Sequence, residues 1–165
     1  MYTPTTYFHP QYGIMPQQPF ERNTMSSNQS CLQSALLLVR QSVQGEREDE
    51  LFYQYLISIA PTQEEREIIA SIRDDERKHN QMFRMIFKDF TGQDIQASNA
   101  ETFTPPASYV DGIKKALFGE LRAVEKYRKI KQCLPEGKYR DMLFEIITDE
   151  LKHASKYNYL FTLNH

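Results

Sequence analysis

The sequence is poor in cysteine and glycine, and each shortage excludes a class of protein. Its two cysteines, Cys31 and Cys133, stand far apart and form no CxxC pair, so the chain alone cannot build a zinc ribbon or a rubredoxin-type iron site. We expect both cysteines to be reduced thiols. Only 6 of the 165 residues are glycine, and no segment alternates apolar and polar residues as a half-buried strand does. A β-sheet protein is therefore not expected.

The chain also lacks an excess of one charge and a long apolar run. A net charge of -2 with scattered basic residues gives no reason to expect nucleic acid or an anionic membrane as a partner. The longest apolar run, residues 35–39, is far too short to span a bilayer. No Lys or Arg precedes a hydrophobic stretch near the N-terminus, as it would in a secretory signal. We expect a cytoplasmic protein with no membrane and no nucleic acid as partners.

The first segment of the chain has a composition of its own. Residues 1–27 are rich in Tyr, Pro, Gln, Thr and Ser, and the prolines interrupt any helical or strand period. Residues 28–165 have the length of one folded domain. The sequence predicts a low-complexity tail followed by a single domain, and a partner-binding role for the tail remains an alternative to a solvated extension.

Four segments of this domain repeat apolar residues every three or four positions, which is the period of an amphipathic helix. Pro61 ends the first segment, and Thr62 with Glu65 forms the capping-box pattern that starts the second. Gly92 ends the second segment, and Pro135 begins a Pro-Glu-Gly interruption between the third and the fourth. The predicted helices cover residues 27–60, 62–91, 108–134, and 138 to the end of the chain.

The lengths of the connections predict how these helices pack. The first and second helices are joined tightly, as are the third and fourth, so each pair should form an antiparallel hairpin. Residues 93–107 form a polar connection that is long enough to run the length of a bundle. The predicted fold class is all-α: a four-helix bundle of two antiparallel hairpins joined by one long crossover.

The two halves of the domain match each other at an offset of 74 residues, since Gly45–Glu46 corresponds to Gly119–Glu120. The block Asp-Glu-x-Lys-His occurs at residues 75–79 and again at 149–153. A repeat that served packing alone should keep its apolar positions best, whereas these matches are largely polar and ionisable. We interpret the halves as one duplicated hairpin that carries chemistry.

Metal-ligating residue types fall on the inward stripes of all four predicted helices. On a helix, residues i and i+3 share a face, so each glutamate of the repeated block points the same way as the histidine three residues later. Two further glutamates continue the apolar stripes of the first and third helices. The residues predicted to face one interior are Glu46, Glu76, His79, Glu120, Glu150 and His153.

Four buried carboxylates need positive charge, because even one isolated buried charge is costly. No Lys or Arg occupies the inward stripes, whereas two divalent ions would bring four positive charges to four carboxylates. Carboxylate with imidazole suits iron or manganese, and the lack of a thiolate argues against copper(I) and structural zinc. One Glu from each of two helices with Glu-x-x-His from each of the other two is a known di-iron or di-manganese arrangement. We therefore predict two iron ions, with manganese as the alternative.

These residues carry a resemblance to a known family. From about residue 30 to residue 162, the chain resembles the ferritin-like superfamily, most closely the rubrerythrin-like di-iron carboxylate proteins. The resemblance implies a ferritin-like bundle with bridging and terminal metal ligands. Glu76 and Glu150 would bridge the two metals, Glu46 and His79 would complete one metal, and Glu120 and His153 would complete the other.

The chain departs from rubrerythrins at two points. It has no cysteines for the iron–tetracysteine domain that feeds electrons to the di-iron centre, so the electron donor is not named by the sequence. Many rubrerythrins also have an extra Glu three residues after the glutamate of the third helix, and this chain has Ala123 there. The resemblance therefore does not imply redox-linked ligand switching through that residue.

Four more residues could support the ligands. Tyr53 and Tyr127 lie two turns beyond Glu46 and Glu120 on the same faces, so each hydroxyl could bond a ligand carboxylate; plain core tyrosines are the alternative. Asp75 and Asp149 precede the proposed bridging glutamates. Each could accept the second N–H of a histidine on the neighbouring hairpin, and solvated helix charges are the alternative.

Four functions are consistent with such a chain. The first is an oxidoreductase whose reduced metal pair reacts with a small oxidant, hydrogen peroxide or dioxygen. The others are a ferroxidase that handles iron, a di-iron hydroxylase of an organic substrate, and a structural bundle. We favour the first because the bundle is small and carries no obvious substrate-binding insertion. A homodimer is compatible with the sequence.

Overall fold

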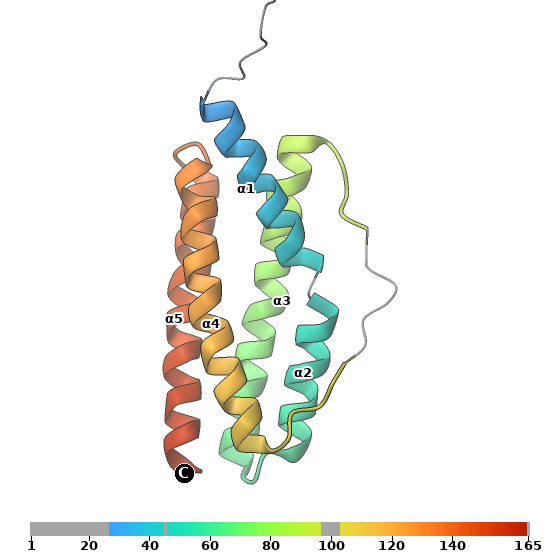
Figure 1. Ribbon diagram of the computed structural model, residues 1–165, viewed down its shortest axis with the longest axis vertical. Coiled ribbons are helices and arrows are strands. Elements are labelled where there is room, and N and C mark those ends of the chain that lie inside the picture. Colours follow the sequence, from blue (N-terminus) through green and yellow to red (C-terminus); the bar gives the residue numbers. More distant parts are fainter. Residues whose placement is uncertain (1–26, 45, 97–102, 165) are drawn as a thin grey trace, which may run out of the picture.

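The computed structural model describes residues 27–44, 46–96 and 103–164, and within these ranges every regular element is a helix (Figure 1). The helices are α1 (Ser27–Gln44), α2 (Glu46–Ile59), α3 (Gln63–Thr91), α4 (Tyr109–Cys133) and α5 (Lys138–Leu163). The predicted all-α bundle is therefore confirmed. None of the described helices is both long enough and apolar enough to cross a membrane. The predicted tail lies outside the described residues, apart from Ser27, which begins α1.

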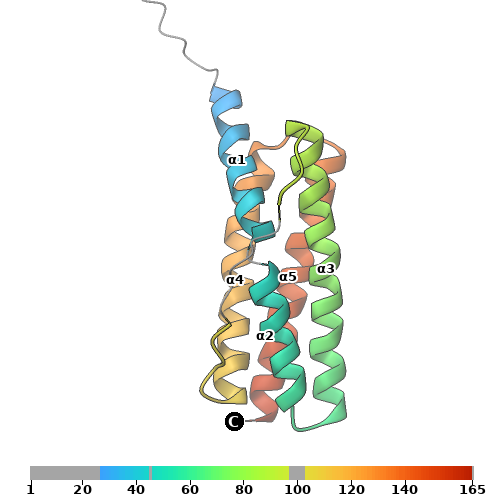
Figure 2. The same cartoon turned by 90° about the vertical axis from the view of Figure 1, so that its right-hand side faces the viewer.

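The first predicted helix differs from the expectation of one continuous element. The structure divides it into α1 and α2, which follow one another along the same side of the bundle (Figure 2). The division falls between Gln44 and Glu46, and the residue between them lies outside the described residues. The bundle thus has four columns: α1 with α2, then α3, α4 and α5. Because α3 ends at one end of the bundle and α4 begins at the other, the predicted crossover is present (Figure 1).

Capping residues set the helix boundaries that the sequence predicted. The Thr62 hydroxyl accepts a hydrogen bond from the backbone N–H of Glu65 at 3.2 Å and so satisfies one free donor at the start of α3. Gly92 ends α3 in the left-handed conformation, with φ of 70°, and donates its N–H to the Lys88 carbonyl. Ser108 caps α4 in the same way as Thr62 caps α3.

The core consists of two apolar clusters with a polar layer between them. On α3, Ile69 and Ile72 belong to one cluster, and Phe83 and Ile86 belong to the other. The helices α4 and α5 contribute to both clusters in the same manner. The buried polar residues between the clusters are His79, Glu120, Glu150 and His153. Apolar packing above and below therefore fixes the level at which these side chains meet.

The two cysteines are not the free thiols that the sequence analysis expected. Cys31 at the start of α1 and Cys133 at the end of α4 form a disulfide, with a Cα–Cα distance of 5.2 Å. The expectation was wrong because a separation of 102 residues says nothing about spatial distance. The helices α1 and α4 run in opposite directions side by side, so the first turn of one meets the last turn of the other (Figures 1 and 2).

Two glycines of α4 provide a matched test of helix packing. A Cβ atom at Gly112 would lie 2.4 Å from Leu56 Cδ2 and 3.0 Å from Pro106 Cγ, whereas the nearest atom at Gly119 would be 4.0 Å away. Leu56 is fully buried and has little room to move. We expect Gly112→Ala to lower the free energy of unfolding by about 1–2 kcal/mol through overpacking. We expect Gly119→Ala to raise it by up to about 1 kcal/mol through helix propensity. Chemical denaturation measures both, and equal effects would contradict the packing.

Candidate metal centre

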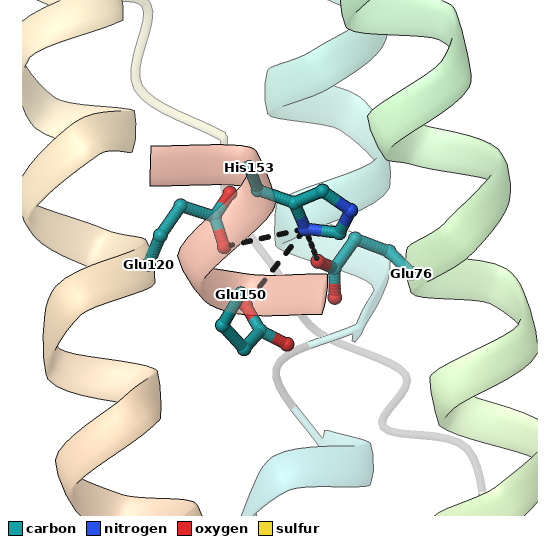
Figure 3. Close-up of side chains that lie close together, drawn as sticks. All are labelled: Glu76, Glu120, Glu150 and His153. Atoms are coloured by element: carbon teal, nitrogen blue, oxygen red, sulfur yellow. Dashed lines mark ion pairs between the residues drawn. The ribbon is translucent and has the colours of Figure 1, made fainter. Parts of the chain in front are cut away.

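The polar layer collects side chains from three helices. Glu76 comes from α3, Glu120 from α4, and Glu150 and His153 from α5, and all four point toward one another (Figure 3). One ligand atom from each lies within 4.8 Å of the others. The spacing of three residues between Glu150 and His153 brings both to the same face of α5, as the sequence predicted. Glu46 is the first residue of α2, but its side chain lies outside the described residues.

His153 is surrounded by three carboxylates. Its Nδ1 lies 3.2 Å from Glu76 Oε1, 3.7 Å from Glu120 Oε2 and 4.0 Å from Glu150 Oε2 (Figure 3). The imidazole itself is completely buried. This half of the site therefore has one nitrogen and at least three oxygens around a common centre.

His79 occupies the corresponding place in the other half. Its Nδ1 lies 3.3 Å from Glu150 Oε1 and 3.7 Å from Glu76 Oε2. The two imidazole rings lie 5.8 Å apart between centroids. Glu76 and Glu150 thus each present one oxygen to His79 and the other to His153. That position between two nitrogen centres is the one that a bridging carboxylate requires.

The outer nitrogen of each histidine is held by the opposite hairpin. His79 Nε2 lies 3.1 Å from Asp149 Oδ2, and His153 Nε2 lies 3.1 Å from Asp75 Oδ2. Lys152 Nζ contacts both aspartates, at 2.6 Å from Asp149 Oδ1 and 3.0 Å from Asp75 Oδ2. A carboxylate next to Nε2 favours a proton on that nitrogen and leaves the Nδ1 lone pair for a ligand. Both aspartates belong to the repeated block singled out in the sequence.

The two candidate tyrosines behave differently. The Tyr53 hydroxyl donates a hydrogen bond to Glu120 Oε1 at 3.3 Å and is buried. Tyr127 is also buried, and its ring packs against Phe83 with the ring centroids 4.9 Å apart. Tyr53 therefore orients a carboxylate of the cluster, whereas Tyr127 belongs to one of the apolar clusters. The sequence could not distinguish them, because both tyrosines follow a glutamate at the same spacing.

Burial and mutual repulsion perturb the titration of the cluster. Burial lowers the pKa of His153, but the Glu120 and Glu76 carboxylates raise it more, to about 10. Burial, a hydrogen bond with Glu120 and the charge of Glu76 raise the pKa of Glu150 well above its usual range. Burial would also raise the pKa of Glu76, but its interactions with His153 and His79 lower it overall. Without a metal ion, imidazolium groups are the cations that face these carboxylates.

Four buried atoms at the centre make no hydrogen bond: Glu76 Oε1, His79 Nδ1, Glu150 Oε1 and His153 Nδ1. Although His153 Nδ1 lies only 3.2 Å from Glu76 Oε1, the angular requirement of a hydrogen bond is not met. Buried polar atoms are rarely left without a partner. All four are atoms that bind divalent metal ions, and they converge on one space, so the donor set fits the metal pair predicted from the sequence.

Comparison with known proteins places the chain in a family. The model of the Rubrerythrin family matches residues 38–161, which is most of the chain. The chain belongs to the rubrerythrin family. The match includes every residue that the sequence analysis proposed as a ligand, and no rubredoxin domain accompanies it.

One solved structure similar to this rubrerythrin-family chain is the crystal structure of a conserved hypothetical protein, Rv2844, from Mycobacterium tuberculosis. The two are 14% identical, with a TM-score of 0.59, and the alignment covers 79% of this chain and 94% of the other. At that identity the likeness concerns the fold alone. No curated protein sequence matches the chain.

A cleft between α2 and α4 leads from the surface to the candidate metal centre, and the sequence analysis did not predict it. Its volume is about 490 Å³, and Glu76, Glu120 and Glu150 form part of its lining. Asp49 from α2 and Lys126 from α4 face the cleft as well. Partial burial and the charges of Glu76 and Glu120 raise the pKa of Asp49 to about 7, although its side chain remains accessible to solvent in the cleft. No repeat or spacing in the sequence marks these two residues.

The titration of the cluster predicts how the metal-free protein responds to pH. The pKa values of His153, His79 and Glu150 are raised above their usual values, so the stability that their protonated forms contribute is lost as pH rises. For His153 the loss runs from about pH 6.5 to about 10 and amounts to on the order of 5 kcal/mol, since each pKa unit corresponds to about 1.4 kcal/mol. Glu76 has a lowered pKa, so its contribution disappears only in acid and does not oppose this loss.

We therefore expect the free energy of unfolding of the metal-free protein to fall steadily between pH 6 and pH 10. The metal-loaded protein should change much less, because metal binding requires deprotonated histidines and deprotonated carboxylates. Urea unfolding of both forms across this range is the measurement. Parallel curves for the two forms would contradict a buried cluster that exchanges protons for metal.

Proposed function

We propose that the chain is a di-metal carboxylate oxidoreductase that binds two iron ions, or two manganese ions, and reacts with hydrogen peroxide or dioxygen. The observation that carries the proposal is the convergence on one centre of four buried ligand atoms, from two hairpins, that make no hydrogen bond. Membership of the rubrerythrin family supports it. A metal pair at this place would supply electrons to the oxidant and act as a Lewis acid.

The residues around the proposed metal pair would have different roles. Glu76 and Glu150 would bridge the two metal positions, since each faces both histidines. His153 with Glu120 would complete one position, and His79 with Glu46 would complete the other. Asp75 and Asp149 hold the imidazole rings in the tautomer that presents Nδ1. Tyr53 orients Glu120 from the wall of the cleft.

Metal analysis followed by rapid oxidation tests the proposal. We expect close to two iron or manganese ions per chain, and oxidation of the reduced metal pair when peroxide or dioxygen is mixed with the protein. A single metal ion per chain, or zinc alone, would contradict it. Formation of an iron mineral would favour the ferroxidase, and a chain without metal would favour the structural bundle.

A specific observation also favours the second candidate, a hydroxylase of an organic substrate. The cleft that reaches the cluster is much larger than a molecule of peroxide or dioxygen needs. A homodimer and the cytoplasmic location stay predictions. The disulfide weighs against the last of these, because such bonds are rare in reducing compartments.

A further inference from the structure

The size of the cleft between α2 and α4 points to a ligand larger than the oxidant. Its volume of about 490 Å³ falls in the range of sites that bind small organic molecules. A water molecule occupies about 30 Å³ in the liquid, and a peroxide molecule is not much larger than two waters. The cleft is open to solvent at one end and reaches Glu76, Glu120 and Glu150 at the other.

Apolar side chains line much of this cleft. Phe52 of α2 and Phe103, from the segment before α4, meet at the rim with ring centroids 6.4 Å apart and an interplanar angle of 65°. Ala116 and Ala123 of α4 form a wall of small side chains, and the Tyr127 ring lies beside them. Both phenylalanines are only partly buried, so part of each ring remains available for contact with a ligand in the cleft. These surfaces suit the apolar body of a ligand.

Two cations on α4 face the cleft without an ion-pair partner among the described residues. Arg122 extends over Gly119, where its terminal nitrogen would lie 4.0 Å from a Cβ atom. Lys126 lies one turn further along the helix, and its Nζ is 4.9 Å from the centre of the Tyr127 ring. The third cation of the lining, Lys115, is already paired with Asp111 at 3.2 Å.

The acidic groups of the cleft do not cancel these cations. The carboxylates at its inner end belong to the proposed metal cluster. The two on α2, Glu48 and Asp49, are both exposed to solvent, so water screens their charges. Arg122 and Lys126 therefore remain as positive groups on the wall opposite α2. A ligand that has both an anionic group and an apolar part would interact with the cations of α4 and with the apolar lining of the cleft.

We infer that the cleft between α2 and α4 binds a small organic carboxylate, with its anionic group at Arg122 and Lys126 and its apolar body against Phe52 and Phe103. The inference concerns binding. It rests on the proposed function in that it names the class of molecule that would lie beside the metal pair.

The test uses the full-length, metal-loaded protein and calorimetric titration with octanoate and 4-phenylbutanoate. The matching alcohols and amines serve as probes of the same shape without the negative charge. We expect saturable binding of the carboxylates, at least tenfold tighter than that of the alcohols and the amines. Absence of saturable carboxylate binding, equal binding of all three classes, or preference for the amines would overturn the inference.

Variants of α4 locate the binding. We expect Arg122→Gln combined with Lys126→Met to weaken carboxylate binding at least tenfold. Arg128→Gln is the matched control, since Arg128 lies on the same helix outside the cleft and pairs with the exposed Glu125 at 3.3 Å. Unchanged binding in the double variant, or an equal loss in the control, would overturn the inference.

Metal content measured on the same samples separates the two proposals. A protein with two metal ions that is oxidised by peroxide and binds no carboxylate would refute the inference and leave the proposed function standing. A protein that binds carboxylates in the cleft and holds no metal would support the inference and refute the proposed function.

Discussion

Replacing Glu150 by alanine is expected to remove both metal ions from the purified protein. Glu150 Oε1 faces His79 at 3.3 Å and Oε2 faces His153 at 4.0 Å, so its loss takes a ligand from each metal position. We expect the same result for Glu76→Ala, because Glu76 also faces both histidines. His79→Ala should mainly weaken one position, since its Nδ1 points to one side of the cluster. Mass-spectrometric metal analysis should give close to none for the glutamate variants and about one for the histidine variant.

Two controls make this prediction specific. Glu67→Ala changes an exposed glutamate on α3 that bonds Gln63, and Glu48→Ala changes an exposed glutamate on α2, so both should keep full metal content. Glu150→Gln should lose metal yet stabilise the metal-free protein by about 1–2 kcal/mol, because a neutral amide replaces a carboxyl group whose ionisation is disfavoured. If Glu76→Ala kept both metals and full oxidation rate, the repeated acidic block would be a structural feature only.

Reduction of the disulfide is expected to lower the free energy of unfolding by about 3–4 kcal/mol. The bond joins residues 102 positions apart, and closing a loop of that length removes much of the conformational entropy of the unfolded chain. Urea unfolding with and without a reductant measures the difference. The combined variant Cys31→Ser and Cys133→Ser should unfold like the reduced protein.

The disulfide should not affect the metal site. Cys133 packs against the apolar cluster that includes Ile130 and Leu134, away from the polar layer. Metal content should therefore be equal in the oxidised and reduced protein. Two free thiols in protein purified without reductant, or identical unfolding curves, would show that the bond does not form in solution.

The sequence predicted the features that depend on local periodicity. The helical period, the Thr62 cap and Gly92 gave the boundaries of α3, and the spacing of Glu76 to His79 gave a shared helix face. These features follow from neighbours within a few residues. The repeated block also pointed to one common interior, because equivalent positions in two packed hairpins face each other.

Other features depend on contacts between segments that share no pattern. The pairing of Cys31 with Cys133 follows from the neighbouring positions of α1 and α4, and the cleft follows from three segments that leave space between them. Tyr53 bonds Glu120 whereas Tyr127 packs against Phe83, although both tyrosines follow a glutamate at the same spacing. None of these contacts has a signature in the order of the residues, so each required the three-dimensional structure.

The crossed contacts between Asp75 and His153 and between Asp149 and His79 have a consequence for the dynamics of the bundle. Each hairpin orients the imidazole of the other, so a complete set of ligands exists only while the two hairpins are docked. Metal binding is then coupled to docking, and the metal-free chain should open between hairpins at a lower free energy than within either one. Amide hydrogen exchange of the metal-free protein would show the faces of α3 and α5 that meet becoming accessible before the helices themselves unfold.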